Sequence, residues 1–299
     1  MRIFVTGATG FIGSALVPEL LAAGHEVLGL ARSQAGADAL AGAGVAVHRG
    51  TLEDPASLRR GAERAEAVVH AAFDHDFSRF AANCEKDRRA IAALGEALKG
   101  SDRPLLITSG TGMGDAGPGR PATEDVFNTA HPNPRVASEL AGAALLESGV
   151  NVSVMRLPQV HDTRKQGLVT YFIATARLRG VSAYVGEGAN RWPAAHVSDV
   201  ARLYRLAIER REPGARYHAV AEAGVAARAI AEAVGRGLSI PAVSLAPAAA
   251  ADHFGPMAMF AALDMPASSA LTRARVGWHP TGPGLLEDLA RMDDGAGPR

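Results

Sequence analysis

The amino-acid sequence predicts an α/β protein in which a doubly wound parallel sheet is followed by a smaller mixed annex. In residues 1–164, six short apolar runs alternate with helical patterns through mostly short connections, which is typical of parallel strands joined by right-handed crossovers. In residues 165–292 this regular alternation of strands and helices ends, and helical stretches mix with short extended segments. We expect this second part to cover the strand ends, and residues 293–299 to form a flexible tail.

The composition is that of a soluble globular protein. The 299 residues are 47% hydrophobic and 21% charged, which is enough for one large domain with an annex. Positive and negative side chains balance at 31 each without a basic run, so neither nucleic acid nor an anionic membrane is an expected partner. Cys84 is the only cysteine, and neither a leader pattern nor an apolar run of membrane-spanning length is present, so we expect a cytoplasmic location.

The first strand and helix meet in a glycine-rich turn. An apolar run at residues 3–5 is followed by glycines 7, 10 and 13 and by a helical pattern over residues 11–23. Such a junction gathers unpaired N–H groups at the positive end of a helix dipole, where a pyrophosphate binds well. We therefore expect a dinucleotide cradle here, made by Thr6, Gly7, Thr9, Gly10, Phe11, Ile12 and Gly13.

The second strand, residues 25–30, ends at Ala31-Arg32-Ser33. A protein that selects NAD usually places an acidic residue here to bind the ribose hydroxyls. Arg32 and Ser33 instead offer a guanidinium and a hydroxyl, which suit a 2′-phosphate. The sequence therefore favours NADP over NAD.

The third strand, residues 45–48, leads to a segment beside the expected adenine site. Leu52 is the candidate apolar contact for the adenine. Asp54, followed by Pro55, has the pattern of a helix start, with Asp as the cap and Pro at the first helical position.

The fourth strand, residues 66–70, ends in two small residues. Ala71 and Ala72 let a cofactor lie across the strand end, and His70 is expected to be packed there. The adjacent Asp74, His75 and Asp76 lack the spacing of a metal site, so we expect a polar loop and no bound metal.

The rest of the chain continues these patterns. A helix at 78–98 precedes the fifth strand at 104–108 and a glycine-rich loop at 109–114, and a helix at 134–148 precedes the sixth strand at 152–157. The annex has helical stretches at 168–179, 200–210, 226–235 and 283–292, and extended pieces near Ala183, Ala194 and Tyr217.

The chain resembles the extended or atypical branch of the short-chain dehydrogenase/reductases, the NAD-dependent epimerase/dehydratase proteins. The resemblance rests on four motifs: TGATGFIG at 6–13, RLP at 156–158, AHVSDVA at 195–201 and GWHP at 277–280. It implies a Rossmann-type fold and a dinucleotide whose nicotinamide lies near the ends of strands four, five and six, beside Pro158. The oligomeric state stays open, with a homodimer as one option, since the long helices before and after strand five commonly form dimer interfaces in proteins that the chain resembles.

The catalytic box of that family is absent. Its members use a Tyr that protonates the carbonyl oxygen, a Lys four residues later and an upstream Ser or Thr. Here Arg135 and Glu139 line up with the Tyr and the Lys, and none of the four tyrosines is followed four residues later by a lysine. Arginine keeps its proton and glutamate has the wrong charge. Arg135 and Glu139 either form an exposed ion pair, or Arg135 grips the cofactor ribose or an anionic substrate group.

Other residues must then supply the chemistry. Ser109 and Thr111 are candidates for a hydroxyl that polarises a carbonyl. His161, just after Pro158, is expected to face the substrate and relay a proton, with His131 as second choice. His196 is expected to be structural.

The resulting hypothesis is an NADP-dependent oxidoreductase that moves hydride between the nicotinamide and a carbonyl or alcohol carbon of a small organic substrate. A different reading is an NADP(H)-binding protein with little turnover that acts as a sensor or interaction module, because the Tyr and Lys are missing. A sugar-nucleotide epimerase or dehydratase is less favoured, since it relies on the same Tyr.

Overall fold

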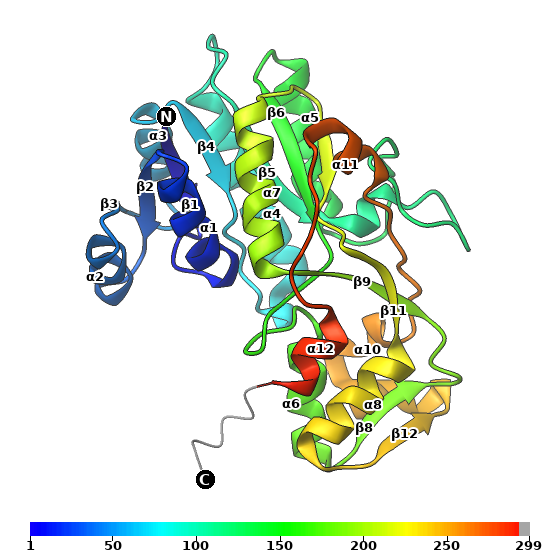
Figure 1. The fold of residues 1–299 in the computed structure, drawn as a ribbon. Helices are drawn as coiled ribbons and strands as arrows, with labels where there is room; N and C mark the ends of the chain where they lie inside the picture. The colour runs from blue at the N-terminus through cyan, green and yellow to red at the C-terminus, as the bar shows by residue number, and fades with distance from the viewer. Residues whose placement is uncertain (293–299) are drawn as a thin grey trace.

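A seven-stranded parallel sheet forms the centre of the larger part of the protein (Figure 1). The computed structural model describes residues 1–292, so the expected tail at 293–299 lies outside the described residues. The strand order is β10-β6-β5-β4-β1-β2-β3. These strands are β1 (Arg2–Thr6), β2 (Glu26–Ala31), β3 (Ala46–Arg49), β4 (Ala67–His70), β5 (Leu105–Gly110), β6 (Val152–Leu157) and β10 (Arg216–His218). The predicted doubly wound parallel sheet is confirmed.

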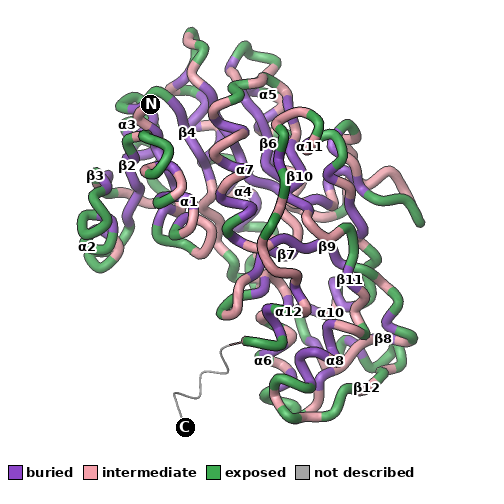
Figure 2. The backbone as a smooth tube through the Cα atoms, viewed as in Figure 1, coloured by how far each residue is buried: buried purple, intermediate pink, exposed green. Residues whose placement is uncertain are grey.

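Two layers of helices cover the sheet, and side chains alternate between them along each strand. Ile3 and Val5 pack toward one layer, whereas Phe4 packs toward the other. The first layer contains α1 (Phe11–Ala22), α2 (Gln34–Gly42) and α7 (Val197–Arg210). The second contains α3 (Pro55–Glu63), α4 (Phe80–Glu96) and α5 (Val136–Glu147). The strands between these layers are largely buried (Figure 2).

The predicted boundary at residue 164 does not separate the two parts of the chain. Strand β10 pairs in parallel with β6, with Arg216 opposite Val154, although it lies more than fifty residues beyond that boundary. Helix α7 also lies beyond residue 164 and packs against α1. Without β10, strand β6 would be an unprotected edge, and so the second part of the chain completes the first.

The annex lies at one end of the large sheet (Figure 1). It has a three-stranded sheet of β7 (Gln159–His161), β9 (Arg191–His196) and β11 (Glu222–Ala226), and a pair formed by β8 (Ser182–Val185) and β12 (Ala242–Leu245). Its helices are α6 (Val169–Arg179), α8 (Ala227–Leu238), α9 (Ala250–Phe254), α10 (Ala258–Ala261) and α12 (Leu285–Ala290). Helix α11 (Ala270–Val276) instead packs against β10 and α7 of the larger part (Figure 1). Within residues 1–292, no helix has the length and apolar character needed to cross a membrane.

The strand order reverses direction between β1 and β4. From β1 the chain proceeds outward to β2 and β3, and from β4 it proceeds the other way to β5 and β6. Ligands of open parallel sheets bind outside the carboxyl ends of the strands at such a reversal. The residues that end β1, β4 and β5 are therefore the first place to look for a site.

Candidate active site

The glycine-rich turn after β1 is closely packed and requires its glycines. Gly7 has a φ of +72°, and a Cβ there would lie 2.7 Å from the amide nitrogen of Ala72. A Cβ on Gly13 would lie 2.0 Å from the carbonyl oxygen of Gly7. The first turn of α1 carries no acidic residue, and Gly10 gives it no side-chain cap. The N–H groups of Phe11 and Ile12 thus begin a helix that suits an anion, and the cradle fits a dinucleotide pyrophosphate.

A hydrogen bond joins the ends of the two strands at the reversal. The hydroxyl of Thr6 lies 2.7 Å from Nδ1 of His70 and accepts the N–H of Ala72 at 3.3 Å. The N–H of Ala71 is bonded to the carbonyl of Thr6. His70 is fully buried, as expected, and Ala71 and Ala72 are held against the turn at Gly7.

The ends of β2 and β3 bring two arginines together. Arg32 is exposed at the end of β2, and the Ser33 hydroxyl caps α2 by accepting the N–H of Gly36 at 3.1 Å. Nη1 of Arg49 donates to the carbonyl of Ser33. Sequence reasoning missed Arg49, which directly follows the predicted third strand; the pairing of β2 with β3 places it opposite Ala31.

The segment after β3 has the expected helix cap. The carboxylate of Asp54 accepts the N–H of Ser57 at 3.0 Å, and Pro55 opens helix α3, so the predicted cap is confirmed. Leu52 is half-buried against the core below α3 and α4, and its contact with adenine stays a prediction. Thr9 lies near the first turn of α2, where a Cβ on Gly36 would be 3.5 Å from its methyl carbon.

Arg135 is fixed at the start of α5 by three hydrogen bonds. Nη1 donates to Asp87 Oδ2 at 2.5 Å and to Ser138 Oγ at 2.8 Å. Nη2 donates to the carbonyl oxygen of Thr108, near the end of β5, at 2.8 Å. The guanidinium carbon lies 3.9 Å from the ring centre of Phe73, in the loop after β4. The side chain is 12% exposed, so this cation is held in one orientation at the strand ends.

Asp87 is the buried centre of this arrangement. Besides Arg135, its carboxylate accepts the hydroxyl of Ser138 at 2.6 Å and contacts Nε2 of His70 at 3.0 Å. Burial favours the neutral acid, but the charge of Arg135 and the bonds from His70 and Ser138 outweigh it and hold the pKa of Asp87 at about 2. A continuous chain of contacts thus runs from Thr6 through His70 and Asp87 to Arg135.

Glu139 corrects one of the two readings of the Arg135–Glu139 pair. It is buried, and both of its carboxylate oxygens accept hydrogen bonds from Arg156 on β6, at 2.8 and 2.9 Å. Arg216 on β10 lies 3.4 Å from the same carboxylate. The predicted exposed ion pair between Arg135 and Glu139 is therefore wrong. Arg135 pairs with Asp87, whereas Glu139 pairs with Arg156 in the interior.

Ser109 has an unpaired hydroxyl and follows Thr108, whose carbonyl binds Arg135. Thr108 faces the α7 layer, where its hydroxyl donates to the carbonyl of His70 and lies 2.6 Å from the Tyr204 hydroxyl. Side chains alternate along β5, so Ser109 faces the layer of α4 and α5. It is 3% exposed, and in the described part of the chain its Oγ has no hydrogen-bond partner. Thr111 is also buried and begins the turn Thr111–Gly114.

His161 does not face an open substrate site, contrary to expectation. It is fully buried, and its Nδ1 lies 2.6 Å from Asp288 Oδ2 on helix α12. Burial lowers its pKa, while the bond to Asp288 opposes that shift. The reason is that the chain turns after Pro158 into β7, which belongs to the annex sheet. A role of His161 in proton transfer stays a prediction.

The other histidines differ in surroundings. His131 is half-buried, and its Nε2 would lie 3.9 Å from a Cβ on Gly112 in the turn after β5. His196 caps α7 by accepting the N–H of Ser198, and this agrees with its expected structural role.

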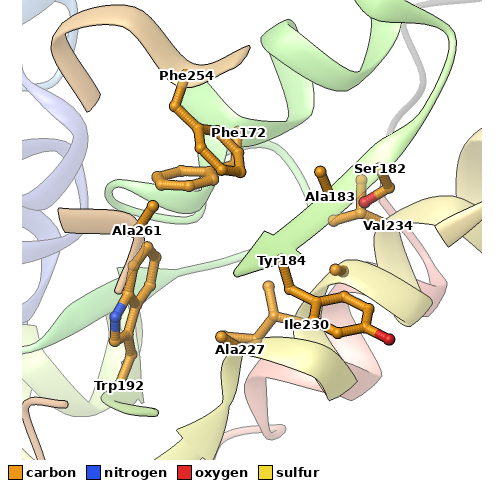
Figure 3. A pocket seen from close by; sticks show the side chains of 11 residues that line it. Phe172, Ser182, Ala183, Tyr184, Trp192, Ala227, Ile230, Val234, Phe254 and Ala261 are labelled. Carbon is orange, nitrogen blue, oxygen red and sulfur yellow. The ribbon is translucent and has the colours of Figure 1, made fainter. Parts of the chain in front are cut away.

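A small apolar cavity lies inside the annex, between Phe172, Trp192 and Phe254 (Figure 3). Its volume is about 30 Å³, room for about one water molecule and too little for an organic substrate. Trp192 is only 3% exposed and belongs to the apolar core of the annex. This cavity is therefore separate from the arrangement around Arg135.

Comparison with known proteins places the chain among its relatives. The model of the NAD dependent epimerase/dehydratase family matches residues 3–221. The chain belongs to this family. The uncharacterized protein C2A9.02 of Schizosaccharomyces pombe is 45% identical over 291 residues, which are 97% of this chain and 98% of that protein. A 2-alkyl-3-oxoalkanoate reductase of Stenotrophomonas maltophilia is 28% identical over 230 residues, which are 72% of this chain and 67% of that protein.

The fold of this family member is shared by solved structures. A dTDP-glucose 4,6-dehydratase from Streptomyces venezuelae, crystallised with NAD, superposes with a TM-score of 0.78 at 21% identity. The match covers 98% of this chain and 95% of that one. At this identity the likeness shows the fold.

Proposed function

We propose that this family member is an NADP-dependent oxidoreductase that transfers hydride between the nicotinamide and a carbonyl or alcohol carbon of a small organic substrate. The observation that carries the proposal is the guanidinium of Arg135, fixed by Asp87, Ser138 and Thr108 at the sequence position of the family's Tyr. When bound, the cofactor supplies or accepts the hydride. The protein's own residues hold the cofactor and the substrate and stabilise the charge that develops on the substrate oxygen.

In this proposal, Arg135 and Ser109 together replace the missing Tyr in stabilising the substrate oxygen. Arg135 contributes a fixed positive charge, which costs no reorganisation during the reaction. Ser109 offers an unpartnered O–H to the carbonyl oxygen from the same side of β5. Because arginine keeps its proton at physiological pH, the proton that completes the alcohol comes from solvent.

The preference for NADP is supported by the charges beside Ser33. Arg32 and Arg49 lie at the ends of the adjacent strands β2 and β3, and both are exposed at this edge. Two guanidinium groups suit a 2′-phosphate, whereas an acidic residue for the ribose hydroxyls of NAD is absent from residues 31–33. The named activity of the 3-oxoalkanoate reductase also supports carbonyl reduction.

The absence of Tyr and Lys favours a second candidate, an NADP(H)-binding protein that senses the cofactor without turnover. The oxidoreductase and the sensor are distinguished by measuring the decrease in NADPH absorbance with a panel of ketones, aldehydes and oxo acids. We expect consumption by the native protein and at least 100-fold lower kcat/KM in Arg135→Gln, since loss of a charge-stabilising donor has effects of about 10²–10³. Arg88→Gln, at an exposed pair on α4, is the matched control. Tight NADPH binding with no consumption would support the sensor.

A further inference from the structure

The hydrogen bonds of Arg135 leave one edge of its guanidinium free. An arginine has five N–H groups, and Nη1 donates toward Asp87 Oδ2 and Ser138 Oγ, which lie 2.6 Å from each other. One N–H on Nη2 is used by the carbonyl of Thr108. Across residues 1–292, neither Nε nor the second N–H of Nη2 has an acceptor within hydrogen-bond distance. These two nitrogens are neighbours on one edge of the planar group.

Two parallel N–H groups on a guanidinium edge match the two oxygens of a carboxylate. Three protein acceptors and the ring of Phe73 already hold this guanidinium in place. Little side-chain freedom remains to be lost when a ligand binds, so the edge is prepared for a bidentate partner. A neutral ketone would use one of the two donors and leave the other unpaired.

A second cation, Lys165, lies beside the first turn of α1. Asp87 neutralises one unit of charge at Arg135, but Lys165 has no carboxylate within 4.0 Å among the described residues, unlike Lys86 and Lys99. Its ammonium lies 6.0 Å from the ring centre of Phe11. Desolvation lowers the pKa of His75, and the charges of Arg135 and Lys165 lower it further, so both cations act on this one side chain.

The turn that carries Lys165 is itself well ordered by hydrogen bonds. The carboxylate of Asp162 accepts the N–H groups of Arg164 and Lys165 at 2.7 and 2.8 Å. The N–H of Asp162 donates to the carbonyl of Lys165 at 2.8 Å. The annex thus presents this lysine toward the first turn of α1 in a defined position.

We infer that the substrate is an oxo acid, whose carboxylate binds the free edge of Arg135 while its carbonyl oxygen accepts the hydroxyl of Ser109. The inference rests on the proposed function and names its substrate class. The carbonyl carbon accepts hydride from NADPH, its oxygen takes a proton from solvent, and the products are a hydroxy acid and NADP. Lys165 adds attraction for the anion from the annex side.

Matched pairs of acid and ester test this inference by turnover. We expect the native protein to reduce phenylglyoxylate or acetoacetate with at least 10-fold higher kcat/KM than the corresponding methyl ester. Lys165→Met, at an exposed position, should raise KM for the acid several-fold and KM for the ester by less, whereas Lys99→Met should change neither. Esters reduced as well as acids would overturn the inference and leave the proposed function standing.

A binding measurement tests the inference without turnover. Oxamate carries a carboxylate next to a carbonyl and cannot be reduced in this way, and acetamide is its neutral counterpart. We expect oxamate, and not acetamide, to raise the Tm of the NADP-loaded protein, with the shift reduced in Lys165→Met and lost in Arg135→Lys. Equal shifts for the two ligands, or none with either, would contradict a carboxylate site even if no substrate of any class were consumed.

Discussion

The Asp87 carboxylate lies 2.5 Å from Nη1 of Arg135, and this buried pair connects the middle of α4 with the start of α5. A buried charge that loses its partner is costly, and breaking such a pair typically destabilises a protein by about 3–5 kcal/mol. The pair therefore supports both the helix packing and the orientation of the proposed catalytic cation.

Asp87→Asn should lower both stability and activity. The amide keeps the shape of the side chain but removes the charge opposite Arg135, so we expect a loss of about 2–4 kcal/mol in the free energy of unfolding. We also expect at least 10-fold lower kcat/KM with the cofactor Kd nearly unchanged. Urea denaturation and steady-state kinetics measure these effects, with Glu85→Gln on the exposed face of α4 as control. A variant with native stability and kinetics would refute the assigned role.

The same carboxylate gives a defined pH dependence of stability. The pKa of Asp87 is about 2 in the folded protein and near 3.9 when unfolded, so its contribution to stability is complete above about pH 5 and declines as the pH falls from about 5 to 2. The difference between the two pKa values corresponds to roughly 2.5 kcal/mol of stability. The stability difference between native protein and Asp87→Asn should therefore narrow over this range. A constant difference between pH 5 and pH 2 would count against a low folded-state pKa.

Arg32 and Arg49 should control cofactor choice. Arg32→Glu is expected to shift the NADP/NAD affinity ratio toward NAD by at least 10-fold, because the carboxylate repels a 2′-phosphate and can bind ribose hydroxyls. Arg49→Gln should weaken NADP several-fold and leave NAD nearly unchanged. Titration of each variant with both cofactors provides the ratios. Ratios equal to that of the native protein would show that neither guanidinium contacts the 2′-phosphate.

Gly13→Ala should abolish dinucleotide binding. The added methyl group would lie 2.0 Å from the carbonyl oxygen of Gly7. Only a movement of the backbone can relieve this clash, and such a movement would distort the glycine-rich turn. Gly24→Ala is not a suitable control because Gly24 has a φ of +80°. Gly42→Ala is suitable, since a Cβ there meets nothing within 4 Å and its φ is not positive. Full cofactor affinity in Gly13→Ala would argue that this turn is not the pyrophosphate site.

His161→Gln should report mainly on the annex. Its bond with Asp288 ties β7 to α12, so we expect a lower Tm and at most a few-fold change in kcat. A general acid would instead lower kcat by about 10²-fold or more and change the pH profile. A loss of kcat of that size would support the proton-relay role that the sequence predicts for His161.

The main sheet could be predicted because its signals are local. All six predicted strands are present, with ends that agree within two residues, since apolar runs and glycines mark each strand and turn. The three-residue strand β10 was not assigned to the large sheet, because its pairing with β6 depends on how the chain returns from the annex. Pairing over such a distance leaves no local pattern.

The site was partly predictable for the same reason. Arg135 could be identified from its position in the helix after strand five, but its partner Asp87 lies 48 residues earlier on α4. One signal was present: Asp87 interrupts the buried face formed by Cys84, Ala90, Ile91 and Leu94, where an unpaired acid would be costly. The burial of His161 was not predicted, because the turn after Pro158 sends β7 into another sheet.

The return of the chain to form β10 limits how the protein can be divided. A fragment that ends at residue 164 would expose the N–H and C=O groups of β6 along its whole edge and uncover the face of α1 that α7 occupies. Such a fragment should aggregate and fail to bind dinucleotide, despite containing every glycine of the cradle. Cofactor binding in this protein would therefore be acquired late in synthesis, after residue 218 has left the ribosome.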